Sequence, residues 1–200
     1  MAASTRESLL AYLRVLDGHL VATGKSTPIY LSGGAAVVLA YGSTERTKDV
    51  DAFVATRNEI LDELQAWAGK HTAVAKREGY FFEVVPPIYP AAPGMFDRAL
   101  PIQGLNLRAL APFAIELHDI IITKLGRYHA KDRSDIELVT RIPGFRSEHL
   151  TKLYELARAD LKTYWPDKLE KTDANFNSVR TGILGLPPAD WGDDDEFSPP

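Results

Sequence analysis

Apolar residues recur along this chain at the spacing of one helix face in several separate stretches. Between residues 4 and 22, leucines fall three or four positions apart and predict a packing helix. Proline or glycine interrupts the pattern between the stretches. The same spacing predicts further helices over 58–67, 112–128, 131–142 and 147–164, followed by a weaker helix that reaches about residue 182.

Short runs of β-forming residues lie between these predicted helices. The run 80–85 is apolar or aromatic apart from Glu83 and is ended by two prolines, so we expect a central strand covered on both faces. The alternation of strands and helices indicates an α/β or α+β fold with a helical extension at the C-terminus. The predicted strands are 29–31, 49–54, 80–85 and 105–110.

Composition narrows the chemistry that the chain can carry. Its 200 residues can bury a core, and the absence of cysteine excludes disulfides, thiolate metal sites and cysteine nucleophiles. No stretch has the apolar length that a membrane span needs, so we expect a cytoplasmic protein with no membrane partner.

Charge is unevenly distributed along the chain. The segment 186–200 lacks a packing pattern and carries five acids, so we expect a disordered acidic tail after a core over 1–110 and a helical part over 111–185. Without those five acids, 23 basic and 22 acidic residues remain. A site for a polyanion must therefore be a local patch.

The most informative stretch is 29–54, where a glycine pair separates a strand from a helix and a second strand carries two aspartates. Gly33 and Gly34 let the backbone approach a ligand closely, and the N–H groups of the first helical turn favour an anion. Asp49 and Asp51 lie two residues apart in an extended segment, so their carboxylates face one side. Hard oxygen ligands opposite a phosphate cradle predict a Mg²⁺ site that serves a nucleotide.

Each of these features also has a purely structural explanation when it is taken alone. The two aspartates could face solvent at a strand end, and Lys124 could be a surface lysine whose stem covers apolar residues. In KDRSD, Lys131 and Asp135 have the spacing of a weak helical ion pair. The five histidines show no HxH or HxxxH spacing, so we do not expect a histidine metal site.

Two segments resemble a known group of enzymes. SGGAAVVLAYGSTERTKDVDAF resembles the glycine-pair and DxD signature of the nucleotidyltransferase fold superfamily. LHDIIITKLGRYHAKDRSDIELV is similar to the lysine helix and KDRxD segment of AbiEii-type and related uncharacterised toxin-like nucleotidyltransferases. The resemblance covers about residues 29–141. It implies a small mixed sheet flanked by helices, with the helical part completing the active site.

The resemblance also implies a nucleotide-binding role for the glycine turn. Gly33 and Gly34 would hold triphosphate oxygens, with the Ser32 hydroxyl as an extra donor. Lys131 or Arg133 would contact phosphate as well. Independently of the resemblance, Arg46 and Thr47 precede the second strand and could reach phosphate or base, and a polar turn explains them equally well.

The implied catalytic set combines carboxylates with one lysine. Asp49 and Asp51 would bind two Mg²⁺ ions, with Mn²⁺ as a substitute. Lys124 would pair with the triphosphate, and Asp135 would orient Lys124 or assist catalysis. Glu83 would be the general base on the acceptor hydroxyl or, alternatively, a structural ion-pair partner. Family members more often carry aspartate at that place, so the glutamate departs from the pattern.

We therefore predict a Mg²⁺-dependent nucleotidyltransferase that moves a nucleoside monophosphate from an NTP onto a hydroxyl acceptor. By resemblance, the acceptor is tRNA or another RNA, and the protein is a toxin with a cognate antitoxin protein. Two alternatives stay open: a non-catalytic nucleotide-binding or interaction protein that keeps the fold, and a nucleotidyltransferase with a small-molecule acceptor. The basic residues expected along an RNA backbone are Arg127, Lys131, Arg133, Arg141 and Arg146.

Overall fold

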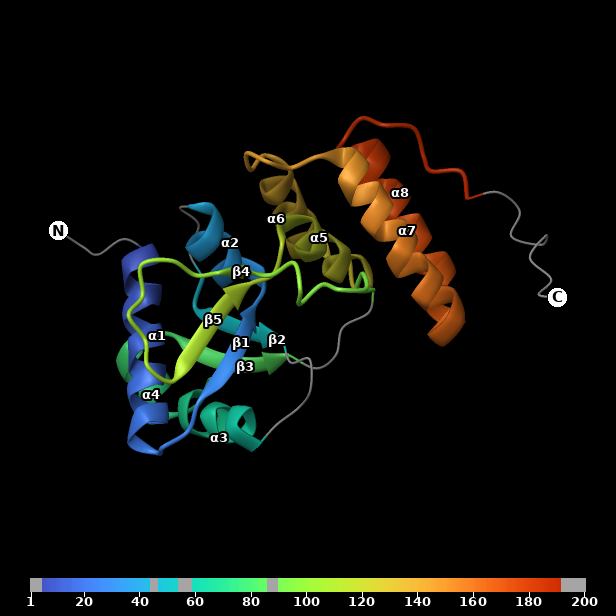
Figure 1. Cartoon of the computed structure of the whole chain (residues 1–200). Helices are drawn as coiled ribbons and strands as arrows, with labels where there is room; N and C mark the ends of the chain where they lie inside the picture. Colours follow the sequence, from blue (N-terminus) through green and yellow to red (C-terminus); the bar gives the residue numbers. More distant parts are fainter. Residues whose placement is uncertain (1–4, 44–46, 54–58, 86–89, 192–200) are drawn as a thin grey trace.

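A five-stranded mixed sheet forms the centre of the protein (Figure 1). This computed structural model describes residues 5–43, 47–53, 59–85 and 90–191. The strand order is β3-β2-β1-β5-β4, in which β1 runs parallel to β5 and antiparallel to β2, and β2 runs parallel to β3. The strands are β1 (Thr27–Leu31), β2 (Asp49–Phe53), β3 (Phe81–Val85), β4 (Leu100–Pro101) and β5 (Leu110–Ala114).

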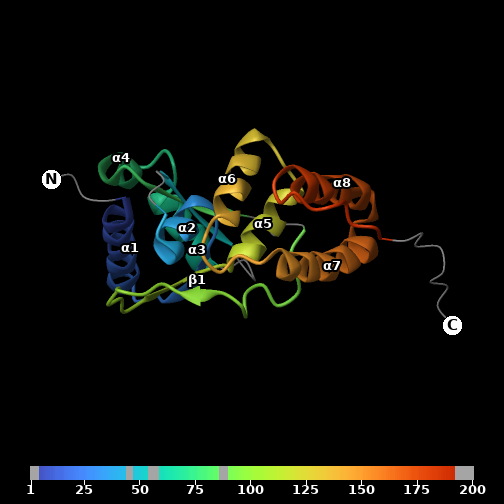
Figure 2. The ribbon, with the colours of Figure 1, turned by 90° about the horizontal axis from the view of Figure 1, so that it is seen from above.

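Helices cover the sheet and extend away from it. Helices α5 and α6 lie between the sheet and the α7–α8 pair, which is at the opposite end of the molecule from α1 (Figures 1 and 2). None of the described helices is long and apolar enough to cross a membrane. The helices are α1 (Thr5–Ala22), α2 (Gly33–Tyr41), α3 (Glu59–Ala68), α4 (Ala73–Glu78), α5 (Leu117–Leu125), α6 (Ala130–Thr140), α7 (Ser147–Tyr164) and α8 (Pro166–Gly182).

The structure confirms the predicted mixed sheet with flanking helices, but the region after residue 104 differs from the prediction. We predicted a strand over 105–110 and a helix beginning at Pro112, whereas Pro112 lies inside β5 and α5 begins at Leu117. The Pro112 carbonyl accepts from the Ile102 N–H, on the side away from β1. Because the N and O of one strand residue point the same way, the missing proline N–H removes no bond to β1.

The beginning of the predicted acidic tail is packed. The Trp191 ring lies 5.6 Å from that of Tyr154 and 5.8 Å from that of Phe176, measured between ring centroids, and the Arg158 guanidinium lies 5.0 Å from it. The expectation of a tail without packing is therefore wrong for the described residues up to Trp191. Residues 192–200, which hold most of the acids, lie outside the described residues.

A buried carboxylate fastens α1 to the start of β5. One oxygen of Asp17 accepts the backbone N–H groups of Arg108 (3.0 Å), Ala109 (2.7 Å) and Leu110 (2.9 Å). Burial alone would raise the pKa of Asp17, but these hydrogen bonds together hold it below its usual range. Since β5 lies between β1 and β4, this contact sets the position of a central strand.

We expect Asp17→Ala to lower the free energy of unfolding at pH 7 by about 2–4 kcal/mol, because three backbone N–H groups lose their acceptor and that of Leu110 is buried. Asp17→Asn keeps one acceptor oxygen and should lose about half as much. Because the folded pKa is depressed, the wild-type advantage should be present at pH 7 and disappear as the pH falls through that pKa. Urea unfolding checks this, with the exposed Glu155→Ala as control. Equal stability of Asp17→Ala and wild type at pH 7 would contradict it.

Candidate functional site

The turn between β1 and α2 requires both of its glycines. Gly33 has a φ of +59°, and a Cβ atom there would lie 2.9 Å from the Asp51 carboxylate. A Cβ atom at Gly34 would lie 2.9 Å from the Thr47 Cβ. Ser32 is the buried N-cap of α2, and its N–H donates to the Asp51 carbonyl. The glycine pair thus lets the start of α2 lie directly against the strand that carries the aspartates.

Three carboxylates meet at this end of the sheet. Asp49 and Asp51 alternate along β2 and share one face of the sheet. Asp51 is paired with Glu83 in the parallel register of β2 and β3, which puts Glu83 beside Asp51 on the same face. The expectation that Glu83 lies in a covered central strand is wrong, because β3 is at the sheet edge and Glu83 is exposed.

The pKa values of Asp49 and Asp51 shift in opposite directions. Burial, together with the nearby charges of Asp49 and Glu83, raises the pKa of Asp51 to about 6. Burial also acts to raise the pKa of Asp49, but the hydroxyl of Thr47 donates to its carboxylate and the net shift is downward. The charges of Lys124 and Lys131 act on both aspartates and favour their ionised forms.

Lys124 projects from α5 toward the acids of α6. Its ammonium lies 2.5 Å from the Asp135 carboxylate and 3.6 Å from that of Asp132. A small cavity brings Lys124 and Asp135 together with Gly33 and Gly34, and its walls are completed by apolar residues. The structure therefore brings the predicted lysine pair and the predicted glycine turn to one place.

The family of the chain follows from comparison with known proteins. The family model described as "Nucleotidyltransferase of unknown function (DUF6036)" matches residues 13–175. The chain belongs to this nucleotidyltransferase family. The finer resemblance to AbiEii-type proteins stays a prediction.

Two crystal structures are similar to this chain. One is of a candidate nucleotidyltransferase from H. pylori, with 15% identity and a TM-score of 0.45, covering 92% of this chain and 88% of that chain. The other is of JHP933 from Helicobacter pylori, with 17% identity and a TM-score of 0.43, covering 90% and 82%. A search of curated proteins found no significant match.

The remaining predicted contacts differ in exposure and in their acidic partners among the described residues. Lys131 and Arg133 are exposed on α6, and the Arg133 guanidinium lies 5.8 Å from the Tyr128 ring. Arg141 lies 3.8 Å from Glu137 across one helical turn. Arg46 lies outside the described residues. The basic residues proposed for RNA therefore do not all have the same freedom to bind it.

Sequence reasoning missed the buried Asp132. Its side chain is 1% exposed and accepts two hydrogen bonds from Arg127 and one from the His129 N–H. The signal was present, because an acid three residues after a helix N-cap commonly accepts from the N-cap N–H. Asp132 thereby joins the end of α5 to the start of α6.

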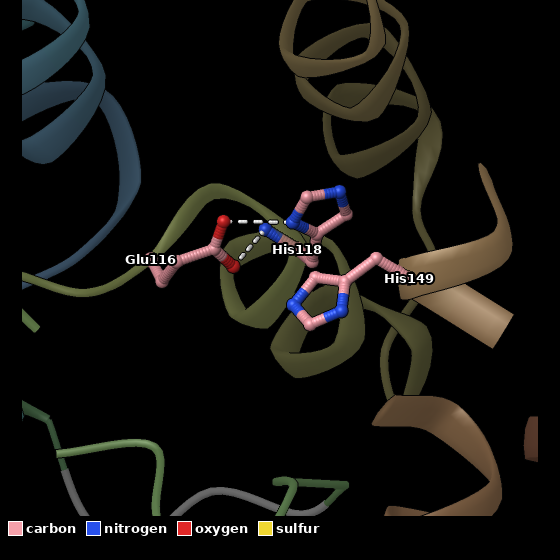
Figure 3. Close-up of side chains that lie close together, drawn as sticks. All are labelled: Glu116, His118 and His149. Atoms are coloured by element: carbon pink, nitrogen blue, oxygen red, sulfur yellow. Dashed lines mark hydrogen bonds and ion pairs between the residues drawn. The ribbon is translucent and has the colours of Figure 1, made fainter. Parts of the chain in front are cut away.

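A second polar cluster lies at the start of α5 (Figure 3). Ligand atoms of Glu116, His118 and His149 lie within 4.8 Å of one another, a grouping that histidine spacing alone did not reveal. His118 is already bonded on both sides, because Nδ1 lies 2.7 Å from Glu116 and Nε2 accepts the Arg146 N–H at 3.0 Å. A metal on Nδ1 would require a proton on Nε2, facing that N–H. The cluster is better explained as a link between α5 and α7.

We expect Asp51→Asn to raise the free energy of unfolding of the metal-free protein at pH 7.5 by about 1–3 kcal/mol. The folded pKa of about 6 lies above the ordinary aspartate pKa of 3.8, so the folded state binds the proton more tightly and wild-type stability falls as the pH rises between these values. The Asp51→Asn variant has no carboxyl group to ionise at this position, so its stability does not fall in this way. Urea unfolding in a chelator at pH 4 and pH 7.5 measures both proteins, with the exposed Glu155→Gln as control. A variant advantage of equal size at both pH values would contradict the assignment.

Proposed function

We propose that this chain is a Mg²⁺-dependent nucleotidyltransferase that transfers a nucleoside monophosphate from an NTP to a hydroxyl acceptor and releases pyrophosphate. The observation that carries the proposal is the meeting of Asp49, Asp51 and Glu83 beside a glycine turn. Membership of a nucleotidyltransferase family supports the reaction class.

The donor set of the two aspartates fits a divalent cation. Asp51 is crowded by the charges of Asp49 and Glu83, and a cation would relieve that repulsion. Asp49 and Asp51 lie on one face of β2 and are the proposed ligands, whereas Glu83 on the neighbouring strand is proposed as the base. Bound Mg²⁺ would offset phosphate charge and orient the triphosphate; Mn²⁺ would suit the same oxygens. The resemblance to the nucleotidyltransferase superfamily implies two such ions.

The protein groups account for the rest of the transfer. Backbone N–H groups at Gly33 and Gly34 would bind triphosphate oxygens, and Lys124 would leave Asp135 for a phosphate. Glu83 would take the proton of the acceptor hydroxyl while the new O–P bond forms at the α-phosphorus and the bond to pyrophosphate breaks. The exposure of Glu83 gives an acceptor access to this carboxylate.

The proposed acceptor is an RNA, with tRNA as the candidate that the AbiEii-type resemblance suggests. Lys131 and Arg133 are exposed on α6, and the charge of Lys131 acts on both aspartates. A strand of RNA lying over these residues would bring a terminal hydroxyl toward Glu83. A toxin role with an antitoxin partner belongs to the same proposal and depends on an RNA acceptor.

We expect wild-type protein to transfer label from α-labelled NTP in Mg²⁺ and to lose transfer in chelator. Asp51→Asn should lower kcat at least about 10³-fold, because the site loses a metal ligand. Glu83→Gln should lower kcat about 10²–10⁴-fold with little change in NTP affinity, because only proton transfer is affected. Each NTP is supplied with bulk tRNA, with other RNA or with small-molecule hydroxyl acceptors, and Glu155→Gln is the control.

The outcomes separate the alternatives. Transfer to RNA supports the proposal, and transfer to a small molecule alone would replace the RNA acceptor. NTP binding without transfer to any acceptor would favour the non-catalytic protein. Unchanged transfer by Asp51→Asn would refute the assignment of the metal site.

A further inference from the structure

Arg127 is a fixed arginine whose outer edge faces solvent. Its Nε and Nη2 donate to the two oxygens of Asp132 at 2.9 and 2.7 Å. Asp132 is 1% exposed, whereas the Arg127 side chain is 64% exposed. A buried carboxylate therefore holds one edge of the guanidinium and leaves the Nη1 group and one Nη2 hydrogen without a partner among the described residues.

Arg98 shows what a structural arginine of this protein looks like. It makes the same two-bond contact with the fully buried Asp119, but it also donates to the carbonyls of Pro93 and Ala92. Its side chain is only 26% exposed. Arg98 makes four hydrogen bonds inside the fold, whereas Arg127 makes two.

Arg127 is connected to the proposed phosphate site through a shared acid. Asp132 is shared with Lys124, which lies 3.6 Å away and lines the cavity at the glycine turn. The hydrogen bond with Asp132 is the main cause of the raised pKa of Arg127, and the charges of Asp51 and Asp135 contribute. Arg127 is thus within electrostatic reach of a predicted metal ligand.

We propose that Arg127 binds the β- and γ-phosphates of the NTP and the pyrophosphate that leaves, and that Asp132 is its positioning residue. This inference rests on the proposed function. A guanidinium held along one edge can offer two parallel donors along another, which matches phosphate geometry and requires little ordering on binding. The clustering of basic residues in the sequence predicted that Arg127 contacts an RNA backbone. Its contact with Asp132, which also lies near Lys124, instead favours the nucleotide.

The test measures binding without turnover, using calorimetry with inorganic pyrophosphate and with NTP in Mg²⁺. Arg127→Ala should weaken both about 10-fold or more, and Arg127→Lys should recover only part, since lysine cannot hold Asp132 through two bonds while facing outward. Arg127→Ala combined with Asp132→Asn removes the uncompensated buried charge and keeps an acceptor for the His129 N–H, so it guards against unfolding. Arg77→Ala is the matched control, because Arg77 is also exposed (65%), also donates to an acid, Glu78, and lies on α4 away from the site.

The positioning role of Asp132 has its own measurement. Asp132→Asn alone should raise KM for NTP more than it lowers kcat and should weaken pyrophosphate binding, which a purely structural role would not do in a protein of unchanged fold. Conversely, wild-type affinity in the Arg127→Ala, Asp132→Asn double variant would overturn the inference and leave the proposed function standing. Loss of RNA affinity alone, with NTP and pyrophosphate binding intact, would also overturn it. If wild-type protein binds neither ligand in Mg²⁺, the proposed function fails and this inference fails with it.

Discussion

Repulsion among three carboxylates is the physical constraint around which the site is built. The parallel pairing of β2 and β3 places Glu83 beside Asp51, and the alternation of β2 adds Asp49 on the same face. Strand pairing and core packing hold these charges together, so the protein accepts an unfavourable arrangement at one end of its sheet. Such local cost is typical of sites whose charges are balanced by a ligand.

The nearby cations of the protein only partly offset the repulsion among the three carboxylates. Lys124 is held by Asp135 and lies near Asp132, and Arg127 is held by Asp132. Each cation therefore already has an acidic partner and adds less net positive charge than its number suggests. A metal ion with a triphosphate would complete the balance, because the metal meets the aspartates and the phosphates meet the cations and the glycine turn.

Local sequence was sufficient to predict the glycine turn, the aspartate pair and the lysine with Asp135. These features depend on strand alternation and helix spacing over short distances, and the contact of Gly33 with Asp51 explains why they occur together. The edge position of Glu83 could not be predicted, because strand order depends on pairings between distant segments. The strand that contains Pro112 could not be predicted for a related reason. A proline is tolerated in a strand only where its missing N–H donor is not needed, and at Pro112 that depends on the pairing with β4.

The arginine in the turn between α5 and α6 shows a different limit. Its sequence context suggests an RNA contact, whereas its partner Asp132 is buried and ties it to Lys124. Charge patterns in sequence indicate where cations gather, but only packing determines which of their donors are already used. Trp191 illustrates the same point for apolar residues, because it packs against α7 and α8 from a segment with no periodic pattern.

The central claim is that burial and neighbouring negative charge together hold Asp51 ready for a cation. The most direct test is a pH titration of the Asp51 side-chain carboxyl carbon by NMR, with and without Mg²⁺. We predict an apparent pKa near 6 in the metal-free protein and a fall by at least about one unit in saturating Mg²⁺, because the metal favours the ionised carboxylate. An ordinary aspartate pKa near 4 without metal, or a pKa that Mg²⁺ leaves unchanged, would contradict the account.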